Sequence, residues 1–193
     1  MFKNIRADTL RVHRRTETLR PIDFLHSLWV NYGLQALVIY RFGRWLSSVR
    51  KNRFGWAIAY PLYPLFWLLS VLARQAYGIN LEQSADIAPG LYIGHFGGVD
   101  VKNCRIGPRC AIQQQVKLGG PETAGGRQAA RGPIIGEGVW IGAHAQICAD
   151  ISVGDGATIG AGTVVKNDIP QRCLVLGNPG RIAQREYDNR AFL

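Results

Sequence analysis

The most regular feature of the chain is an aliphatic residue at every sixth position between residues 133 and 170. The members of this series are Ile135, Ile141, Ile147, Val153, Ile159 and Val165. A second series of small or apolar residues follows four positions later, at Val139, Ala145, Ile151, Ala157 and Thr163. Neither an α-helix nor a β-strand repeats with a period of six, whereas a coil of three short strands turns one residue in six toward its axis. We therefore predict a left-handed parallel β-helix, the form typical of an aliphatic residue followed by glycine.

The same period extends toward the N-terminus as far as Gly78. Two further coils are indicated by Ile87, Ile93 and Val99 and by Ile106, Ile112 and Leu118. The period is then interrupted by a run rich in glycine and small residues, which predicts a protruding loop over residues 119–133. The sequence thus predicts a mainly β domain over residues 79–182, with this loop, and a C-terminal tail over residues 183–193.

Residues 1–78 predict an α-helical region of a different character. We expect a loose or short-helical arm over residues 1–21, a short helix after Asp23 and a second helix over residues 34–49. Residues 56–73 carry no charge, but prolines inside the segment disfavour a membrane span. We predict a kinked helix lying at a lipid interface, and a helix buried between subunits remains the alternative.

Charge is concentrated at the N-terminal end of the chain. Residues 1–53 hold eleven Lys or Arg against three Asp or Glu, which leaves +8 of the total net charge of +10. A basic segment followed by an apolar one, with no nucleic-acid-binding motif, favours an anionic membrane surface over nucleic acid. No apolar signal segment opens the sequence, and the four cysteines show no metal spacing. We expect a cytoplasmic protein with reduced cysteines, peripheral on the inner face of the membrane.

Several segments resemble known proteins. Residues 141–147, 159–165, 168–170 and 177–182 are similar to the C-terminal half of the hexapeptide-repeat acyltransferases. Residues 40–46, 77–81, 93–99 and 116–120 are similar to the serine O-acetyltransferase branch of that superfamily. The apolar segment between helices and repeats resembles the exopolysaccharide acetyltransferases of the colanic-acid type.

The resemblance implies transfer of an acetyl group from acetyl-CoA, as co-substrate and without a metal, to a hydroxyl group. His95 matches the family's catalytic histidine, and a neutral imidazole suits removal of a hydroxyl proton near neutral pH. The implied acceptor-binding residues are Asn80, Gln115 and Arg131. The implied cofactor-binding residues are Gly120, Ala143, Ala161, Gly162, Lys166 and Arg181. A homotrimer is implied, with the helical part either joining two trimers or meeting membrane. His144, two coils beyond His95, is assigned to packing or acetyl-CoA contact, with a catalytic role across the trimer as the alternative.

The chain also departs from the serine-specific pattern. Asn80 and Gly94 stand where the serine enzymes have aspartates, and Gly132 replaces the histidine of their Arg-His-Pro segment. Loss of these groups predicts an acceptor without an ammonium group. We therefore predict O-acetylation of a sugar, either a polymer or a lipid-linked oligosaccharide, in exopolysaccharide synthesis. The alternatives are a serine O-acetyltransferase of cysteine synthesis and a scaffold without activity.

Overall fold

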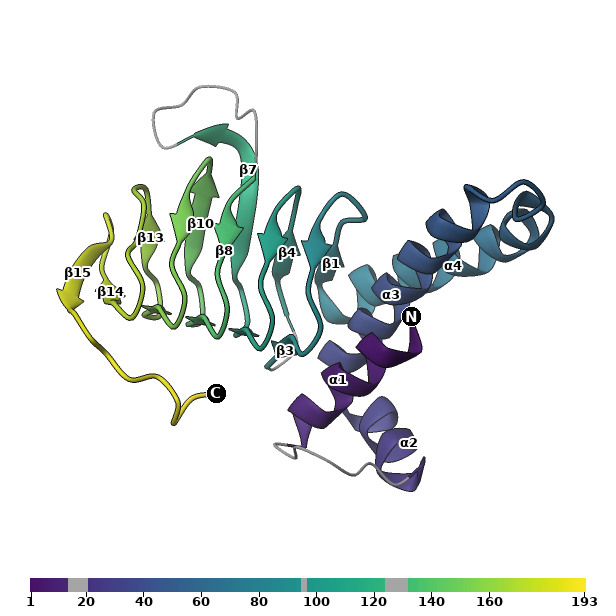
Figure 1. Ribbon diagram of the computed structural model, residues 1–193, viewed down its shortest axis with the longest axis horizontal. Coiled ribbons are helices and arrows are strands. Elements are labelled where there is room, and N and C mark those ends of the chain that lie inside the picture. The colour runs from purple at the N-terminus through teal and green to yellow at the C-terminus, as the bar shows by residue number, and fades with distance from the viewer. Residues whose placement is uncertain (14–20, 95–96, 124–131) are drawn as a thin grey trace.

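The chain forms a helical part followed by a triangular prism of β-strands, shown in Figure 1 by a computed structural model. The structure describes residues 1–13, 21–94, 97–123 and 132–193. The helices end at Tyr77 and the first strand begins at Ile79, so that the two parts are joined directly.

The prism has three faces, each a sheet of short strands. Face A consists, in order, of β1 (Ile79–Leu81), β4 (Val99–Val101), β7 (Lys117–Thr123), β10 (Gln146–Ala149) and β13 (Val164–Val165). Face B consists of β2 (Asp86–Ile87), β5 (Arg105–Ile106), β8 (Ile134–Ile135) and β11 (Ser152–Val153). Face C consists of β3 (Tyr92–Ile93), β6 (Ala111–Ile112), β9 (Trp140–Ile141), β12 (Thr158–Ile159), β14 (Leu174–Leu176) and β15 (Arg181–Gln184).

Neighbouring strands on each face are parallel and belong to successive coils, except that β15 runs antiparallel to β14. The predicted left-handed parallel β-helix with a helical region before it is confirmed. Both sequence series that predicted it point inward: the aliphatic series is at most 2% exposed and the second series at most 4%. A glycine follows an aliphatic apex because the next coil passes close by; a Cβ added at Gly142 would lie 2.6 Å from the backbone nitrogen of Ala161.

The interruption of the period begins later than predicted. Strand β7 continues to Thr123, where it pairs with Ala149 of β10 after a shift in register. Residues 124–131 lie outside the described residues, and the chain rejoins the prism at Gly132 and Pro133, before β8. A Cβ at Gly132 would overlap the carbonyl oxygen of Asn103, since the two atoms would be 1.6 Å apart. The absence of a side chain at 132 therefore has a packing reason.

Four helices precede the prism: α1 (Phe2–Val12), α2 (Pro21–Val30), α3 (Tyr32–Arg50) and α4 (Trp56–Tyr77). The short helix expected after Asp23 begins earlier, at Pro21; proline is favoured in the first turn of a helix, where its missing N–H would have no helical partner. The Asn31 side chain caps α3 by accepting a hydrogen bond from the Leu34 N–H at 2.8 Å. Helices α3 and α4 form a hairpin that projects away from the first coil (Figure 1).

The C-terminal tail folds back along face C instead of extending from the prism (Figure 1). Buried Asn189 donates to the carbonyl oxygens of Gly138 and Ala157, at 2.9 and 3.3 Å. The Phe192 ring lies 5.3 Å from that of Trp140. Residues that follow the prism in sequence are thus packed against its middle coils.

Candidate active site

One edge of the prism carries four of the ten residues implied as functional. At this edge, called the C–A edge here, the chain turns from face C into face A at residues 113–116, 142–145 and 160–163. The C–A edge includes Gln115, Ala143, Ala161 and Gly162, predicted separately from sequence. His95, the predicted catalytic histidine, lies outside the described residues, between β3 and β4 in the sequence.

The turns of the C–A edge are stacked through their backbones. Gln115, His144 and Gly162 adopt left-handed conformations, with φ of 60°, 61° and 68°. Each donates its N–H to a carbonyl oxygen of the preceding coil; the acceptors are Gly97 (2.9 Å), Gln114 (2.9 Å) and Ala143 (2.7 Å), respectively. The repeated turn leaves the side chains of Gln115 and His144 exposed.

The Gly94 departure from the serine-specific pattern has a local cause. A Cβ at Gly94 would lie 2.5 Å from the Oε1 atom of Gln113, which belongs to the next coil. Similarly, a Cβ at Gly98 would lie 2.3 Å from Oε1 of Gln115. The two glutamine side chains fill the space beside Gly94 and Gly98, so that an aspartate at position 94 would require Gln113 to move.

Asn80 is paired with a carboxylate that the sequence analysis missed. Strands β1 and β4 are in register with Asn80 opposite Asp100, and Asn80 Nδ2 donates to Asp100 Oδ1 at 2.8 Å. Both side chains point outward from face A, because Val99 and Val101 on either side of Asp100 are buried. The sequence contains one hint of this pair, a polar residue between two valines, but not its partner.

The second oxygen of Asp100 meets a lysine. Lys102 Nζ lies 2.7 Å from Asp100 Oδ2, and the two side chains are 46% and 32% exposed. Its hydrogen bond with Asp100 raises the pKa of Lys102 above the ordinary value. Asp100, five positions after His95 in the sequence, is therefore held on two sides.

The other predicted residues are more scattered. Lys166 follows β13, at the border of face A opposite Gly162. Burial raises the pKa of the Cys148 thiol, and the nearby Lys166 charge lowers that pKa by a smaller amount. Arg181 is exposed and begins β15, just after Gly180 donates to the carbonyl oxygen of Val164 at 2.8 Å. Gly120 lies within β7. Arg131 lies outside the described residues.

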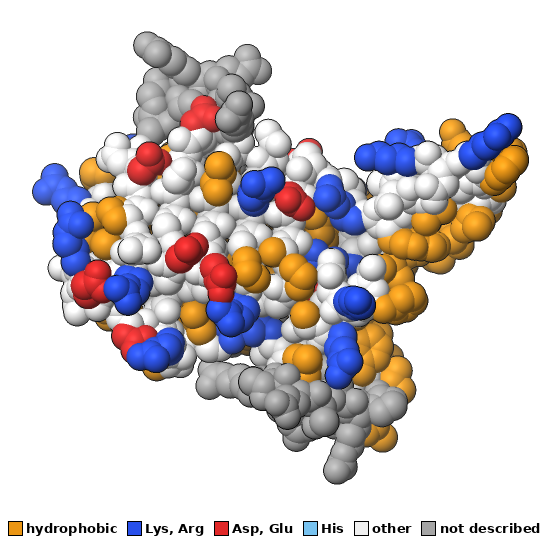
Figure 2. Space-filling view, in the orientation of Figure 1, with side chains coloured by type: hydrophobic (Ala, Val, Ile, Leu, Met, Phe, Trp, Pro, Cys, Tyr) orange, Lys and Arg blue, Asp and Glu red, His pale blue; other side chains and the backbone are white. Residues whose placement is uncertain are grey.

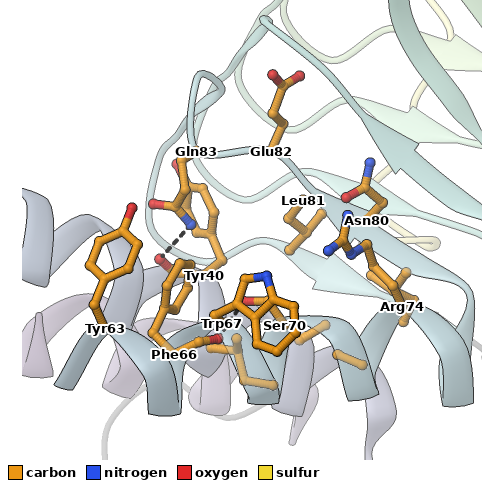
Figure 3. Close-up of a pocket in the computed structure, with 14 residues that line it drawn as sticks. Tyr40, Tyr63, Phe66, Trp67, Ser70, Arg74, Asn80, Leu81, Glu82 and Gln83 are labelled. Atoms are coloured by element: carbon orange, nitrogen blue, oxygen red, sulfur yellow. Dashed lines mark hydrogen bonds between the residues drawn. The ribbon is translucent and has the colours of Figure 1, made fainter. Parts of the chain in front are cut away.

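A cleft of about 300 Å³ lies between the α3–α4 hairpin and β1 (Figure 3). Its walls are largely apolar and include the Tyr63, Phe66 and Trp67 side chains, whereas Arg74 and Asn80 lie beside each other at one end. Among the residues assigned to the acceptor, Asn80 alone lines this cleft. The described ranges of the chain contain no group of three or more His, Cys, Asp or Glu arranged to hold a metal ion.

Comparison with known proteins identifies the family. The family profile "Bacterial transferase hexapeptide (six repeats)" matches residues 132–167. A serine acetyltransferase of Synechococcus elongatus is 34% identical over 186 residues, which cover 96% of this chain and 70% of that protein. This chain belongs to the serine acetyltransferase family. The serine acetyltransferase of Bacillus subtilis is 36% identical over 86% of the chain, and the match covers 66% of that protein.

Solved structures of this family share the architecture. Serine acetyltransferase from Neisseria gonorrhoeae, determined in complex with serine, has a TM-score of 0.71 and 27% identity, covering 93% of this chain and 68% of that one. The enzyme from Brucella abortus, determined in complex with coenzyme A, has a TM-score of 0.75 and 25% identity, with 95% and 68% covered. This serine acetyltransferase family member is thus an acetyl-CoA-dependent O-acetyltransferase, as the sequence predicted.

The predicted acceptor class is wrong. The relatives are serine acetyltransferases, which contradicts a sugar acceptor in exopolysaccharide synthesis and supports the alternative stated beside it. The predicted closeness to exopolysaccharide enzymes is likewise unsupported. The error has a physical source: the prediction counted charges along the sequence and treated Asn80 as a lost carboxylate, whereas the coil register places Asp100 against it. The role of each site residue stays a prediction.

Proposed function

We propose that this family member transfers the acetyl group of acetyl-CoA to the hydroxyl group of serine. The serine oxygen attacks the thioester carbonyl carbon, an O–C bond forms, and the C–S bond breaks to release coenzyme A. The hydroxyl proton passes to the base and then to the departing sulfur. The observation that carries the acceptor assignment is the Asn80–Asp100 pair on face A, in which Asp100 follows His95 by five positions in the sequence.

The argument rests on the charge of the acceptor. Free serine carries an ammonium group, and removing that group from water without a carboxylate partner costs several kcal/mol. Two other nearby aspartates are already engaged: Asp8 is buried against Arg41, and Asp86 lies on face B near Arg44 and Arg105. Asp100 is partly exposed; it accepts a hydrogen bond from the neutral Asn80 amide, and its ion pair is with the partly exposed Lys102, a pair of the kind that contributes at most about 1 kcal/mol. We propose that Asp100 binds the serine ammonium group.

The remaining roles follow the family resemblance. We propose His95 as the base, with Gln115 and Arg131 contacting the acceptor. Ala143, Ala161 and Gly162 have small side chains on successive coils, and the space above Gly162 is open, since an added Cβ would meet no atom within 4 Å. These residues, with Gly120, suit the pantetheine arm of acetyl-CoA, which would lie along the C–A edge. Lys166 and Arg181 are proposed to contact its phosphates.

We propose a homotrimer as the assembled form, in the cytoplasm. In the resembling prism proteins the acetyl group lies between neighbouring chains, so that a trimer would complete each site. Sedimentation velocity would show whether one trimer or a pair of trimers forms; a monomer that retains full activity would contradict this part of the proposal.

Replacement of Asp100 by asparagine tests the acceptor assignment. With serine, Asp100→Asn should lower kcat/KM by about 10- to 100-fold, mainly through KM, because a charged hydrogen bond is lost. With 3-hydroxypropionate, which has the hydroxyl and carboxylate but no ammonium group, kcat/KM should stay the same. A purely structural role for Asp100 would instead lower both values together. Asp86→Asn is the matched control, since it removes an exposed carboxylate on face B.

Lys102→Met provides a second arm. Because Lys102 competes for the same carboxylate, its removal should leave serine KM unchanged or lower it. Absence of serine turnover by the wild-type protein would overturn the proposed function itself. If the wild-type protein turns over serine but Asp100→Asn lowers kcat/KM equally for serine and for 3-hydroxypropionate, only the role of Asp100 is overturned.

A further inference from the structure

The α3–α4 hairpin leaves one side of α4 uncovered. On that helix Ala59, Phe66 and Ala73 are buried, spaced seven residues apart, and only 11% of its most apolar stretch is buried. Large apolar residues around the rest of the helix are 44–65% exposed: Trp56, Ile58, Tyr60, Tyr63, Leu65, Trp67, Leu68 and Leu72. Figure 2 shows such side chains gathered along one side of the projecting hairpin, with Lys or Arg at its tip. Contiguous apolar surface of this kind marks an interaction site.

The charge of the hairpin selects among possible partners. Residues 32–77 contain six Lys or Arg and no Asp or Glu. Two of the six, Arg41 and Arg44, pair with aspartates elsewhere, whereas Arg50, Lys51, Arg53 and Arg74 are exposed. Two copies of this surface packed together would bring cations to cations at both ends of α4. A negatively charged surface complements it instead.

A hollow between α3 and α4 combines an apolar lining with a positive charge. Its volume is about 590 Å³, and its lining is Arg50 from α3 with Ala59, Tyr60, Tyr63, Pro64 and Trp67 from α4. An apolar hollow with a guanidinium in its wall suits a hydrocarbon chain whose phosphate group meets the cation. Tryptophan and tyrosine are also the side chains enriched at the boundary between lipid headgroups and hydrocarbon.

We propose that the exposed side of α4 binds an anionic phospholipid surface, with the helix lying along the headgroup region. This inference is independent of the serine assignment. By length and composition α4 could cross a bilayer, but its buried stripe packs on α3 and its C-terminal end runs directly into β1. All its aromatic residues except Tyr77 lie between Trp56 and Trp67 and do not form a belt at each end, the arrangement typical of a spanning helix. A helix that lies along the headgroup region is consistent with this distribution.

Vesicle flotation with the full chain tests the proposal. The wild-type protein should float with phosphatidylcholine vesicles that contain about 30 mol % phosphatidylserine and stay behind with pure phosphatidylcholine. Salt at about 1 M should release it. Trp56→Ser/Tyr60→Ser should lower the partition coefficient about 100-fold, and Arg50→Ser/Lys51→Ser/Arg53→Ser by a similar factor.

Matched variants on the prism serve as controls. Ile134→Ser/Leu176→Ser removes two exposed apolar residues, and Arg105→Ser/Arg109→Ser/Arg185→Ser removes the same charge as the hairpin triple variant. Both should float as the wild type does, and circular dichroism should show every variant folded. The proposal is overturned if the wild type does not float, if hairpin and prism variants lose binding equally, or if Trp56→Ser/Tyr60→Ser instead dissociates a lipid-free oligomer. The last outcome would show that a second copy covers α4.

Discussion

Arg41 and Asp8 form a buried ion pair where the helices meet the first coil, with 3.1 Å between Nε and Oδ2. The two side chains are only 5% and 1% exposed. Arg41 also donates to the carbonyl oxygens of Ile87 and Ala88, and Asp8 accepts the Gly90 N–H at 2.7 Å. One pair thus connects α1, α3 and the β2–β3 turn, directly before the segment that carries His95.

The first prediction concerns the stability of this junction. Asp8→Ala should lower the free energy of unfolding by about 3–5 kcal/mol, because the guanidinium of Arg41 would stay buried without its carboxylate. Urea unfolding followed by circular dichroism measures the change. Asp86→Ala, which breaks an exposed pair with Arg44, should cost at most about 1 kcal/mol. Equal losses in the two variants would contradict a special role for the buried pair.

The second prediction compares two isoleucines seven positions apart. Ile141 is fully buried inside the prism, whereas Ile134, the residue in β8 before the inward Ile135, points outward and is 49% exposed. Ile141→Ala should cost about 2–5 kcal/mol, since it leaves a cavity between coils. Ile134→Ala should change stability by no more than about 0.5 kcal/mol. Thermal unfolding of the two variants in parallel provides the measurement, and a reversed order would contradict the inward assignment of the period-six series.

The third prediction concerns the base. His95→Ala should lower kcat by about 10²- to 10⁴-fold and leave the KM for acetyl-CoA nearly unchanged. His144→Ala, at an exposed turn of the C–A edge, is the control and should cost less. Steady-state release of the coenzyme A thiol is the assay. A larger loss at His144 would transfer the role of base to that residue.

The fourth prediction concerns alkaline pH. Burial raises the pKa of Cys104 to about 12 and that of Cys110 to about 11. In the unfolded chain these thiols lose their protons near pH 9, so that the unfolded state gains stability as the pH rises above 9 while the folded state retains both protons. Each thiol should then reduce stability by about 1.4 kcal/mol per pH unit.

The comparison with a variant isolates this effect. Cys104→Ala/Cys110→Ala should be less stable than the wild type at pH 8 because of the lost packing. Between pH 8 and pH 10 the difference should shrink by about 2–3 kcal/mol, since the variant lacks these two buried thiols. Urea unfolding at the two pH values measures it. An unchanged difference would show that the thiols ionise equally easily in the folded protein.

The fold was predictable because every coil imposes the same demand on the sequence. Each turn of the prism must direct an apolar side chain inward at its corners, and each glycine after an apex allows the next coil to approach. This requirement recurs every six residues, and all six members of the series from Ile135 to Val165 meet it with a buried aliphatic side chain. The first coils were recognisable from the same period, and the helices from their own. The segments that resemble serine acetyltransferases then indicated the chemistry.

The acceptor could not be predicted in the same way, because it depends on which residues lie opposite each other. Asn80 and Asp100 are twenty positions apart and face each other only because of the number of residues in the coil between them. A position-by-position comparison with the serine enzymes shows that residue 80 is asparagine in place of aspartate. It does not show that Asp100, on the neighbouring strand β4, supplies a carboxylate beside it. Likewise, the sequence shows that α4 is apolar, but the packing on α3 decides which side stays exposed.

The sequence by itself thus determined the repeat and the inward residues, since these follow from short-range patterns that each coil repeats, and its resemblance to the hexapeptide-repeat acyltransferases indicated the chemical class. Only the tertiary structure decided the pairing of Asp100 with Asn80, the closure of the junction by Arg41 and Asp8, and the return of the tail across face C to Trp140. Those contacts join residues distant in sequence, and their formation depends on coil register and on the direction in which each helix leaves the prism. The periodic sequence pattern specifies neither the coil register nor the helix direction.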